Sequence, residues 1–209
     1  MRVTGIVLAG GRSSRMGQDK AAIVLDGRTL LQRACDVLAE AADEIVVVGA
    51  PGRALPEVVS ALDVRRVDDA IEGEGPLFGI AAGLQAARGE VAVVVGCDMP
   101  YLEPALLRLL AERALAGARL VVPLHEGRPE SLCAAWRVNA LPVVRAHLAA
   151  GDRAVMSVAK DLRAVRLEPE AYREADPDGR SFVNINTPGE LEERRQQRGR
   201  RTTEPGGEA

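Results

Sequence analysis

Short apolar runs alternate with longer amphipathic segments along most of the chain. Seven runs are predicted as strands, at residues 3–8, 44–48, 64–67, 91–96, 119–123, 131–136 and 163–167. Several are continuous and rich in β-branched residues, which is typical of strands buried on both faces of a parallel sheet. Helical patterns between them begin at Thr29, Pro76, Pro104 and Pro188, residue types that favour a helix start. The alternation predicts a three-layer, doubly wound α/β fold with a mostly parallel sheet.

The length and composition predict one domain followed by a short tail. The chain has 209 residues and 47% hydrophobic content, which is enough for a single large core. No composition break or internal repeat divides residues 1–193, so we interpret them as one domain. Residues 194–209 (RQQRGRRTTEPGGEA follows Arg194) contain almost no apolar side chains, so we expect a disordered tail.

Charge and cysteine content exclude several classes of protein. A net charge of −3 leaves no basic excess for a protein that coats nucleic acid. No apolar run approaches the roughly 20 residues that cross a bilayer. Cys35, Cys97 and Cys133 are widely spaced, so neither a zinc site nor a disulfide framework is indicated. We therefore expect a cytoplasmic protein without nucleic-acid or membrane partners.

A loop rich in glycine and charge follows the first predicted strand. The stretch "VLAGGRSSRMGQDKAAIVLDG" spans residues 7–27 and combines close-approach glycines with Arg12, Arg15 and Lys20. Ligands of open α/β sheets bind at the carboxyl ends of the strands, where this loop begins. The pattern is neither a Walker A loop nor a dinucleotide fingerprint. A solvated turn is the alternative, but one of only two lysines lies here, and the combination favours phosphate binding.

Asp98 is the second candidate, in the stretch "VVVGCDMPYL" at residues 93–102. Asp98 follows a buried strand and therefore lies at the carboxyl end of that strand. There it could bind Mg²⁺ together with substrate phosphates. The alternative is a helix cap, although the next helix is predicted to begin near Pro104. Cys97 is interpreted as a small core residue, because no base lies near it in the sequence. His125 is a weaker candidate for substrate contact, and His147 is predicted on a helix surface.

Four sequence blocks resemble a known enzyme family. They are "LAGGRSSRMGQDK" (8–20), "GPLFGIAAGL" (75–84), "CDMPYL" (97–102) and "FVNINTPGEL" (182–191). Together, and in this order, they are similar to the molybdenum cofactor guanylyltransferases, within a wider group of nucleotidyltransferases with a Rossmann-like sheet. The resemblance implies transfer of GMP from GTP to the phosphate of molybdenum-bound molybdopterin, with release of pyrophosphate. It also implies Mg²⁺ as cofactor, and molybdoenzymes or their chaperones as candidate recipients of the product.

The resemblance implies a nucleotide site composed of Leu8, Ala9, Gly10, Gly11, Lys20, Asp69 and Asp98. The resemblance also implies that Arg15 and Lys20 are the catalytic cations that hold the triphosphate, and that Asp98 is the catalytic metal ligand. Asp69 in "RRVDDA" matches a family aspartate near the nucleoside, with its neighbour Asp68 as the alternative.

Further matched positions concern the reacting phosphates and the second substrate. Gly75 and Gly79 would form a turn close to the phosphates, and Asn184 and Asn186 would orient the pterin or its phosphate. The chain departs from some family members at Gly49, where they carry asparagine, so a nucleoside hydrogen bond from that side chain is missing here.

The reaction implied by the resemblance needs no general base. A phosphate monoester is largely dianionic near neutral pH, since its second pKa is about 6, and the protein must supply position and charge compensation. The nearest alternative is a molybdopterin cytidylyltransferase, whose loop usually reads L-A-A-G where this chain has Gly10. Another NTP-dependent nucleotidyltransferase would lack the closing N-I-N-T-P. A non-catalytic GTP-binding module would be expected to lose Asp98 or Lys20, and an oxidoreductase is disfavoured by the missing G-x-G-x-x-G.

Overall fold

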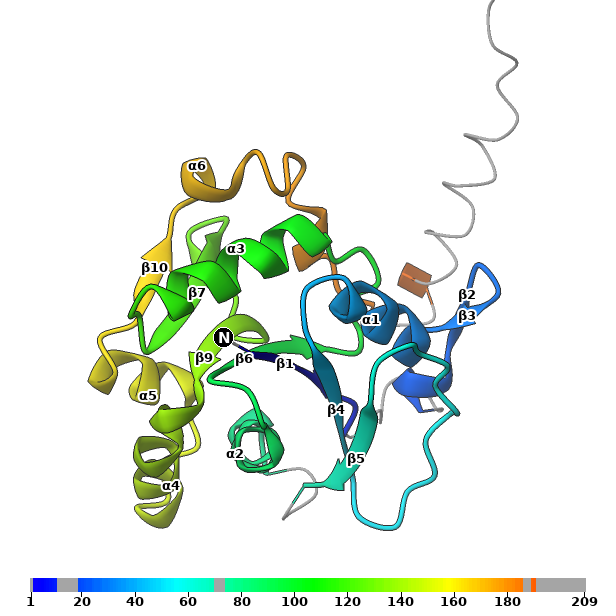
Figure 1. Cartoon of the computed structure of the whole chain (residues 1–209), viewed down its shortest axis with the longest axis horizontal. Coiled ribbons are helices and arrows are strands. Elements are labelled where there is room, and N and C mark those ends of the chain that lie inside the picture. Colours follow the sequence, from blue (N-terminus) through cyan, green and yellow to red (C-terminus); the bar gives the residue numbers. More distant parts are fainter. Residues whose placement is uncertain (1, 11–18, 70–73, 186–188, 191–209) are drawn as a thin grey trace, which may run out of the picture.

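The computed structural model describes residues 2–10, 19–69, 74–185 and 189–190. Its centre is an eight-stranded sheet in the order β10-β7-β9-β6-β1-β4-β5, with β8 paired to β7 (Figure 1). The strands are β1 (Val3–Leu8), β4 (Glu44–Gly49), β5 (Val64–Asp68), β6 (Val91–Gly96), β7 (Leu120–His125), β8 (Arg128–Pro129), β9 (Cys133–Arg137) and β10 (Val165–Leu167). Each of the seven predicted runs overlaps one of these strands, although the runs at 131–136 and 163–167 begin two residues before β9 and β10. The predicted tail and Gly11, Arg15, Asn186 and Pro188 lie outside the described residues.

The mostly parallel sheet that the sequence predicted is confirmed. Strands β6, β1, β4 and β5 are neighbours and run parallel, so their carboxyl ends meet at one edge. Strands β4 and β6 are buried at every position, which explains why their sequences are continuous apolar runs. Strand β9 is antiparallel to both β6 and β7, a reversal that its apolar sequence did not reveal.

Helices cover both faces of the sheet. Helices α1 (Leu30–Ala39), α3 (Pro104–Leu115) and α6 (Pro169–Tyr172) pack on one face, and α2 (Pro76–Ala86), α4 (Leu141–Ala149) and α5 (Val155–Asp161) on the other (Figure 1). The predicted starts of α1, α2 and α3 are confirmed. Helices α5 and α6 were not predicted, because they are too short to show a clear helical period. In the described part of the chain, no helix has both the length and the apolar character required to cross a membrane.

Helix α2 approaches β1 closely through two glycines one turn apart. A Cβ atom on Gly83 would lie 2.7 Å from a methyl carbon of Ile6, and one on Gly79 would lie 3.2 Å from Cδ2 of Leu8. Ile6 and Leu8 point to the same side of β1 because strand side chains alternate. The two glycines therefore allow the start of α2 to reach the carboxyl edge of the sheet.

A small hairpin extends the protein beyond that edge. Strands β2 (Val24–Leu25) and β3 (Arg28–Thr29) pair in antiparallel fashion around Asp26 and Gly27, whose φ angles are 52° and 77°. Two positive φ values are what a two-residue hairpin loop with the sequence Asp-Gly adopts. Ile23, Leu25 and Leu30 pack with Ile185 in a separate cluster. This cluster fixes the segment after Lys20 against the C-terminal part of the described chain.

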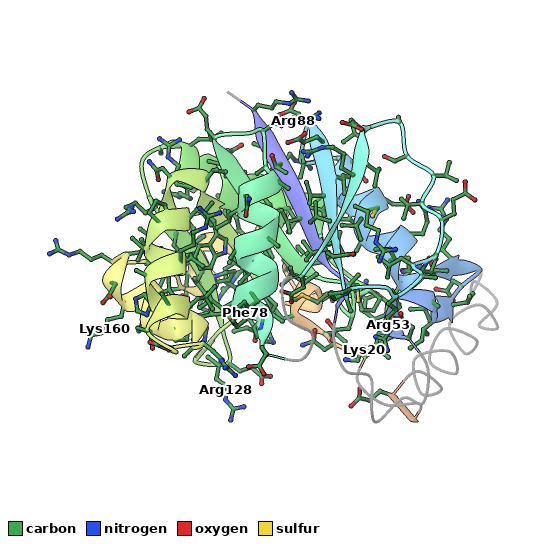
Figure 2. All side chains as sticks on the ribbon, turned by 90° about the horizontal axis from the view of Figure 1, so that it is seen from below. Lys20, Arg53, Phe78, Arg88, Arg128 and Lys160 are labelled. Carbon is green, nitrogen blue, oxygen red and sulfur yellow. The ribbon has the colours of Figure 1, made fainter. Side chains whose placement is uncertain are left out.

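A buried polar network lies at the opposite edge of the sheet. Glu44 is fully buried and accepts hydrogen bonds from the Thr4 hydroxyl (2.7 Å), the Arg65 guanidinium (3.0 Å) and the Arg88 amide (2.8 Å). Burial raises the pKa of Glu44, but these donors together outweigh it and hold the pKa below its usual value. Figure 2 shows Arg88 at the end of the molecule opposite Lys20 and Arg53. The network therefore stabilises the fold away from the candidate site.

Candidate nucleotide site

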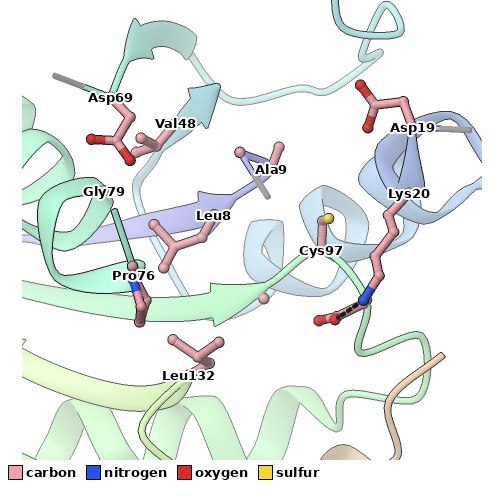
Figure 3. Close-up of a pocket in the computed structure, with 14 residues that line it drawn as sticks. Leu8, Ala9, Asp19, Lys20, Val48, Asp69, Pro76, Gly79, Cys97 and Leu132 are labelled. Carbon is pink, nitrogen blue, oxygen red and sulfur yellow. Dashed lines mark hydrogen bonds and ion pairs between the residues drawn. The ribbon is translucent and has the colours of Figure 1, made fainter. Parts of the chain in front are cut away.

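A cavity of about 300 Å³ opens at the carboxyl ends of β1, β4 and β6 (Figure 3). Its wall is formed by Leu8, Ala9, Gly10, Asp19, Lys20, Val48, Asp69, Gly75, Pro76, Gly79, Gly96, Cys97, Asp98 and Leu132. This is the edge at which doubly wound sheets bind ligands, and the volume is at the lower end of the range for small-molecule sites. All described residues predicted at the nucleotide line this cavity.

The chain leaving β1 lies against the end of β4. The amide of Ala9 donates to the carbonyl of Val48 at 2.8 Å. A Cβ atom on Gly10 would lie 3.2 Å from both the carbonyl carbon of Gly49 and the amide nitrogen of Ala50. Such contacts are tight and involve main-chain atoms, so glycine fits here better than any other residue. The structure thus gives Gly10 a packing reason beside its predicted role.

Lys20 and Asp98 are 78 residues apart in the sequence and meet in the cavity. Lys20 begins the 3-10 helix η1 (Lys20–Ala22), and its Nζ lies 2.8 Å from Oδ2 of Asp98. Figure 3 shows the Lys20 side chain extended from that helix, with the ion pair dashed. About a fifth of each side chain is exposed (23% and 21%). The two candidates that the sequence predicted separately therefore form an ion pair in the cavity wall.

Asp19 organises the start of η1, a role that the sequence analysis did not assign. Its carboxylate accepts a hydrogen bond from the amide of Ala21 at 3.0 Å, which is an N-cap contact. The same carboxylate lies 3.6 Å from Nε of Arg53. The Asp-Lys sequence directly before an apolar segment was the available signal, because aspartate is a favoured N-cap.

Asp98 lies in the cavity wall and does not cap a helix. Helix α3 begins at Pro104 with Glu103 at its N-cap, so the capping alternative for Asp98 is excluded. The amide of Ile185 donates to the Asp98 carbonyl at 2.9 Å, which brings the neighbouring Asn184 to this edge. Asn184 is exposed and is not part of the cavity wall.

The residues present fit Mg²⁺ better than a transition metal. The described residues contain no group of three or more His, Cys, Asp or Glu side chains that could hold a metal. Asp98 instead presents one carboxylate in a cavity that is large enough to admit phosphates. Mg²⁺ is commonly held by one or two carboxylates together with substrate phosphates and water.

The choice between Asp68 and Asp69 is clear from their positions. Asp69 is 7% exposed and lines the cavity, and its amide donates to the Gly49 carbonyl at 2.7 Å. Asp68 is about half exposed and pairs with Arg66 at 3.1 Å, outside the cavity wall. The geometry therefore favours Asp69 as the residue near a bound ligand.

Gly75 and Gly79 bring the start of α2 to the cavity. Gly75 precedes the helix with φ 101°, a value that favours glycine, and contributes no side-chain cap. The first-turn amides of a helix are unpaired within the helix and carry a partial positive charge, so they attract anions. Pro76 also lines the cavity. This end of the wall is therefore suited to phosphate oxygens.

A side chain at position 49 would not face the cavity. A Cβ atom on Gly49 would lie 3.0 Å from Cδ1 of Leu55 and 3.4 Å from a guanidinium nitrogen of Arg66, and neither residue lines the cavity. The missing asparagine at this position thus does not leave a gap in the wall.

Six wall residues were not predicted as site residues, namely Asp19, Val48, Pro76, Gly96, Cys97 and Leu132. The interpretation of Cys97 as a core residue is confirmed by its burial. Val48 and Gly96 end predicted strands, and Leu132 lies in the run predicted at 131–136, although strand β9 begins at Cys133. Cys97 is buried, and burial beside Asp98 raises the pKa of its thiol to about 12. It is therefore unsuited to act as a nucleophile. His125 stacks on Phe182 with ring centroids 4.7 Å apart and is not in the cavity wall.

Comparison with known proteins gives a consistent result. The profile of the MobA-like NTP transferase domain matches residues 5–166. A protein from Desulfosudis oleivorans named "Molybdenum cofactor guanylyltransferase" is 36% identical, with 91% of this chain and 93% of that protein covered. A protein from Chloroflexus aggregans named "Probable molybdenum cofactor guanylyltransferase" is 38% identical, with 91% and 92% covered.

Solved structures share the fold. The crystal structure of molybdopterin-guanine dinucleotide biosynthesis protein A from Archaeoglobus fulgidus has a TM-score of 0.77 at 25% identity, covering 94% of this chain and 99% of that one. The 2-C-methyl-D-erythritol 4-phosphate cytidylyltransferase from Thermus thermophilus has a TM-score of 0.70 at 20% identity, covering 94% and 98%. The second likeness concerns the fold alone.

Proposed function

The chain belongs to the MobA-like NTP transferase family, and on that premise we propose that it is a molybdenum cofactor guanylyltransferase. It transfers GMP from GTP to the phosphate of molybdenum-bound molybdopterin and releases pyrophosphate. The relatives that carry this name are similar over about nine-tenths of the chain. The observation that carries the proposal is the convergence of the Gly10 backbone, Lys20 and Asp98 on one cavity at the carboxyl edge of the sheet.

The proposed binding mode follows from the chemistry of the wall. The guanine nucleoside lies against Leu8–Gly10 and Asp69, and the triphosphate lies between Lys20 and the start of α2. Gly10 supports guanine as the base, since the related cytidylyltransferases, which use CTP, usually carry alanine at this position. Arg15 is proposed to assist Lys20, Gly11 to extend the nucleotide wall, and Asn184 and Asn186 to orient the pterin substrate.

The transfer is a single displacement at the α-phosphorus of GTP. An oxygen of the pterin phosphate attacks, the bond between the α-phosphorus and the bridging oxygen to the β-phosphate breaks, and pyrophosphate leaves. The attacking phosphate is already largely dianionic near neutral pH, so no general base is required. Lys20 compensates the charge of the leaving pyrophosphate. Mg²⁺ held by Asp98 would neutralise phosphate charge. The high pKa of Cys97 argues against a covalent intermediate on this thiol, and the displacement requires none.

The product needs a recipient. A dinucleotide cofactor that remains on the enzyme blocks further turnover, so molybdoenzymes or their chaperones are proposed to take it from this edge of the sheet.

The deciding experiment measures pyrophosphate release from each of the four NTPs, with and without molybdenum-loaded molybdopterin. We expect release from GTP alone among the four, and only with the acceptor present. Equal release from CTP would identify a cytidylyltransferase, and binding of GTP without release would identify a non-catalytic module.

Asp98→Asn separates catalysis from binding in the same assay. The substitution keeps the shape of the side chain and removes its charge, so transfer should fall by about 100-fold or more, whereas nucleotide binding survives in part. Asp178→Asn is the matched control, because Asp178 is exposed and is not in the cavity wall. Near-normal turnover of Asp98→Asn would refute the metal assignment.

A further inference from the structure

The ion pair between Lys20 and Asp98 occupies the carboxylate that the metal needs. Nζ of Lys20 lies 2.8 Å from Oδ2 of Asp98 in the cavity. A divalent cation on the same carboxylate would stand a few ångströms from the ammonium, and two cations at that distance repel strongly at a partly buried site. The ammonium and the metal therefore compete for Asp98.

A bound triphosphate would offer the Lys20 ammonium anionic oxygens in the same cavity. The lysine side chain carries a compact charge on a flexible four-carbon stem, and the wall around it is shared by Gly10 and the start of α2. An ammonium drawn to phosphate releases Asp98, and the same phosphates bring the oxygen ligands that Mg²⁺ requires beside one carboxylate.

The neighbouring carboxylate does not offer the same choice. Asp19 is held by the amide of Ala21 at 3.0 Å and lies 3.6 Å from Nε of Arg53. These contacts fix the start of η1, so that the exchange of partners involves the Lys20 side chain and not its backbone.

We propose that Lys20 prevents divalent cations from binding to the Asp98 carboxylate until a nucleotide binds. The site then takes the metal with or after the nucleotide, and not before it. This inference rests on the proposed function for the identity of the nucleotide. It adds to that function an order of binding and a second role for Lys20, as the residue that balances the charge of Asp98 before the nucleotide binds.

The first test measures Mn²⁺ binding to the nucleotide-free protein by electron paramagnetic resonance of the free ion. Lys20→Met removes the competing charge and keeps a long, unbranched side chain. We expect it to bind Mn²⁺ about tenfold more tightly than the wild type, which is the scale of removing a like charge from a partly exposed site. The gain should vanish in the Lys20→Met, Asp98→Asn double variant.

Lys160→Met is the matched control, because Lys160 is the other lysine of the chain, lies exposed in α5 and is far from Lys20 in Figure 2. It should bind Mn²⁺ like the wild type. Equal Mn²⁺ affinity of Lys20→Met and the wild type would overturn the proposal. A gain that persists in the double variant would overturn it as well, because the metal would then bind elsewhere.

The second test uses the wild-type protein and does not depend on the folding of a variant. With only two lysines, ¹⁵N-lysine labelling yields two side-chain ammonium signals, which the two single variants assign. Guanosine 5′-(α,β-methylene)triphosphate without metal should shift the Lys20 signal, and millimolar Mg²⁺ alone should leave it unchanged. A shift of that signal by Mg²⁺ alone would contradict the proposal.

Neither test requires guanylyl transfer. If Lys20→Met gains Mn²⁺ affinity as expected but the wild-type protein releases no pyrophosphate with any acceptor, the proposed function is refuted and this inference stands. The reverse result, normal transfer with no gain of Mn²⁺ affinity in Lys20→Met, would refute the inference alone.

Discussion

Two glycines of α2 allow the cavity and the core to be perturbed separately. Gly79→Ala and Gly83→Ala add the same methyl group to the same helix, one turn apart. Replacing glycine by alanine inside a helix is worth up to about 1 kcal/mol of stability. What differs is the surroundings of the new methyl group, so the pair isolates the effect of position.

At position 79 the methyl group points toward the cavity wall. It would lie 3.2 Å from Cδ2 of Leu8 and 3.6 Å from Oδ2 of Asp69, and the Leu8 side chain is only partly buried and can move. We expect the free energy of unfolding to stay the same or rise by up to about 1 kcal/mol. The affinity for Mg·GTP should fall by about tenfold or more, because a methyl group replaces space used by the nucleotide.

At position 83 the methyl group enters the core. It would lie 2.7 and 2.9 Å from two carbons of Ile6, which is fully buried. Overpacking of this kind costs about 1–3 kcal/mol, and these short distances favour the upper half of that range. After subtraction of the helical gain, we expect a net loss of about 1–2 kcal/mol, with nucleotide affinity close to wild type at a temperature where the variant is folded.

Urea unfolding and isothermal titration calorimetry with Mg·GTP measure the two quantities on both variants. The reasoning is refuted if Gly79→Ala binds Mg·GTP as tightly as the wild type, because the nucleotide would then not occupy this cavity. It is also refuted if Gly83→Ala loses affinity as strongly as Gly79→Ala while remaining folded.

Three further predictions concern stability and positioning. Glu44→Gln should lower the free energy of unfolding by about 2–3 kcal/mol at pH 7, against no change for the exposed control Glu112→Gln. The depressed pKa of Glu44 means that its contribution to stability is present above about pH 4.5 and is lost as the pH falls through the lower folded pKa. Urea unfolding at a series of acid pH values would contradict this if the difference in free energy of unfolding between Glu44→Gln and Glu112→Gln did not change with pH. His147, which the sequence predicted on a helix surface, is mostly covered and lies between Asp152 (3.0 Å) and Asp161 (2.9 Å), whose hydrogen bonds raise its pKa. The destabilisation by His147→Gln should therefore be largest below about pH 6.5 and decline as the pH rises through the higher folded pKa, and a pH-independent difference in melting temperature would exclude this linkage. Asp19→Ala removes the cap of η1 and should raise the KM for GTP, whereas Asp19→Asn, an equally good cap, should restore it; equal KM values for the two variants would show that the cap does not position Lys20.

The sequence by itself determined most of the secondary structure and the edge of the sheet at which the candidate site lies. The runs that became β4 and β6 are buried on both faces, and burial on both faces leaves a continuous apolar sequence that can be recognised locally. Proline at the first position of α2 and α3 marked their starts. The carboxyl edge as the ligand edge followed from the strand–helix alternation alone.

The tertiary structure decided which of the candidates act together. Lys20 and Asp98 meet across 78 residues because β1 and β6 are neighbours in the sheet, and strand order is not written in any local pattern. The register between β4 and β5 places Asp69 at the cavity and Asp68 outside it, although adjacent aspartates have the same local preference. The ion pair that links Lys20, the proposed phosphate ligand, to Asp98, the proposed metal ligand, exists only in the folded chain, since attraction between two charges depends on their distance in space.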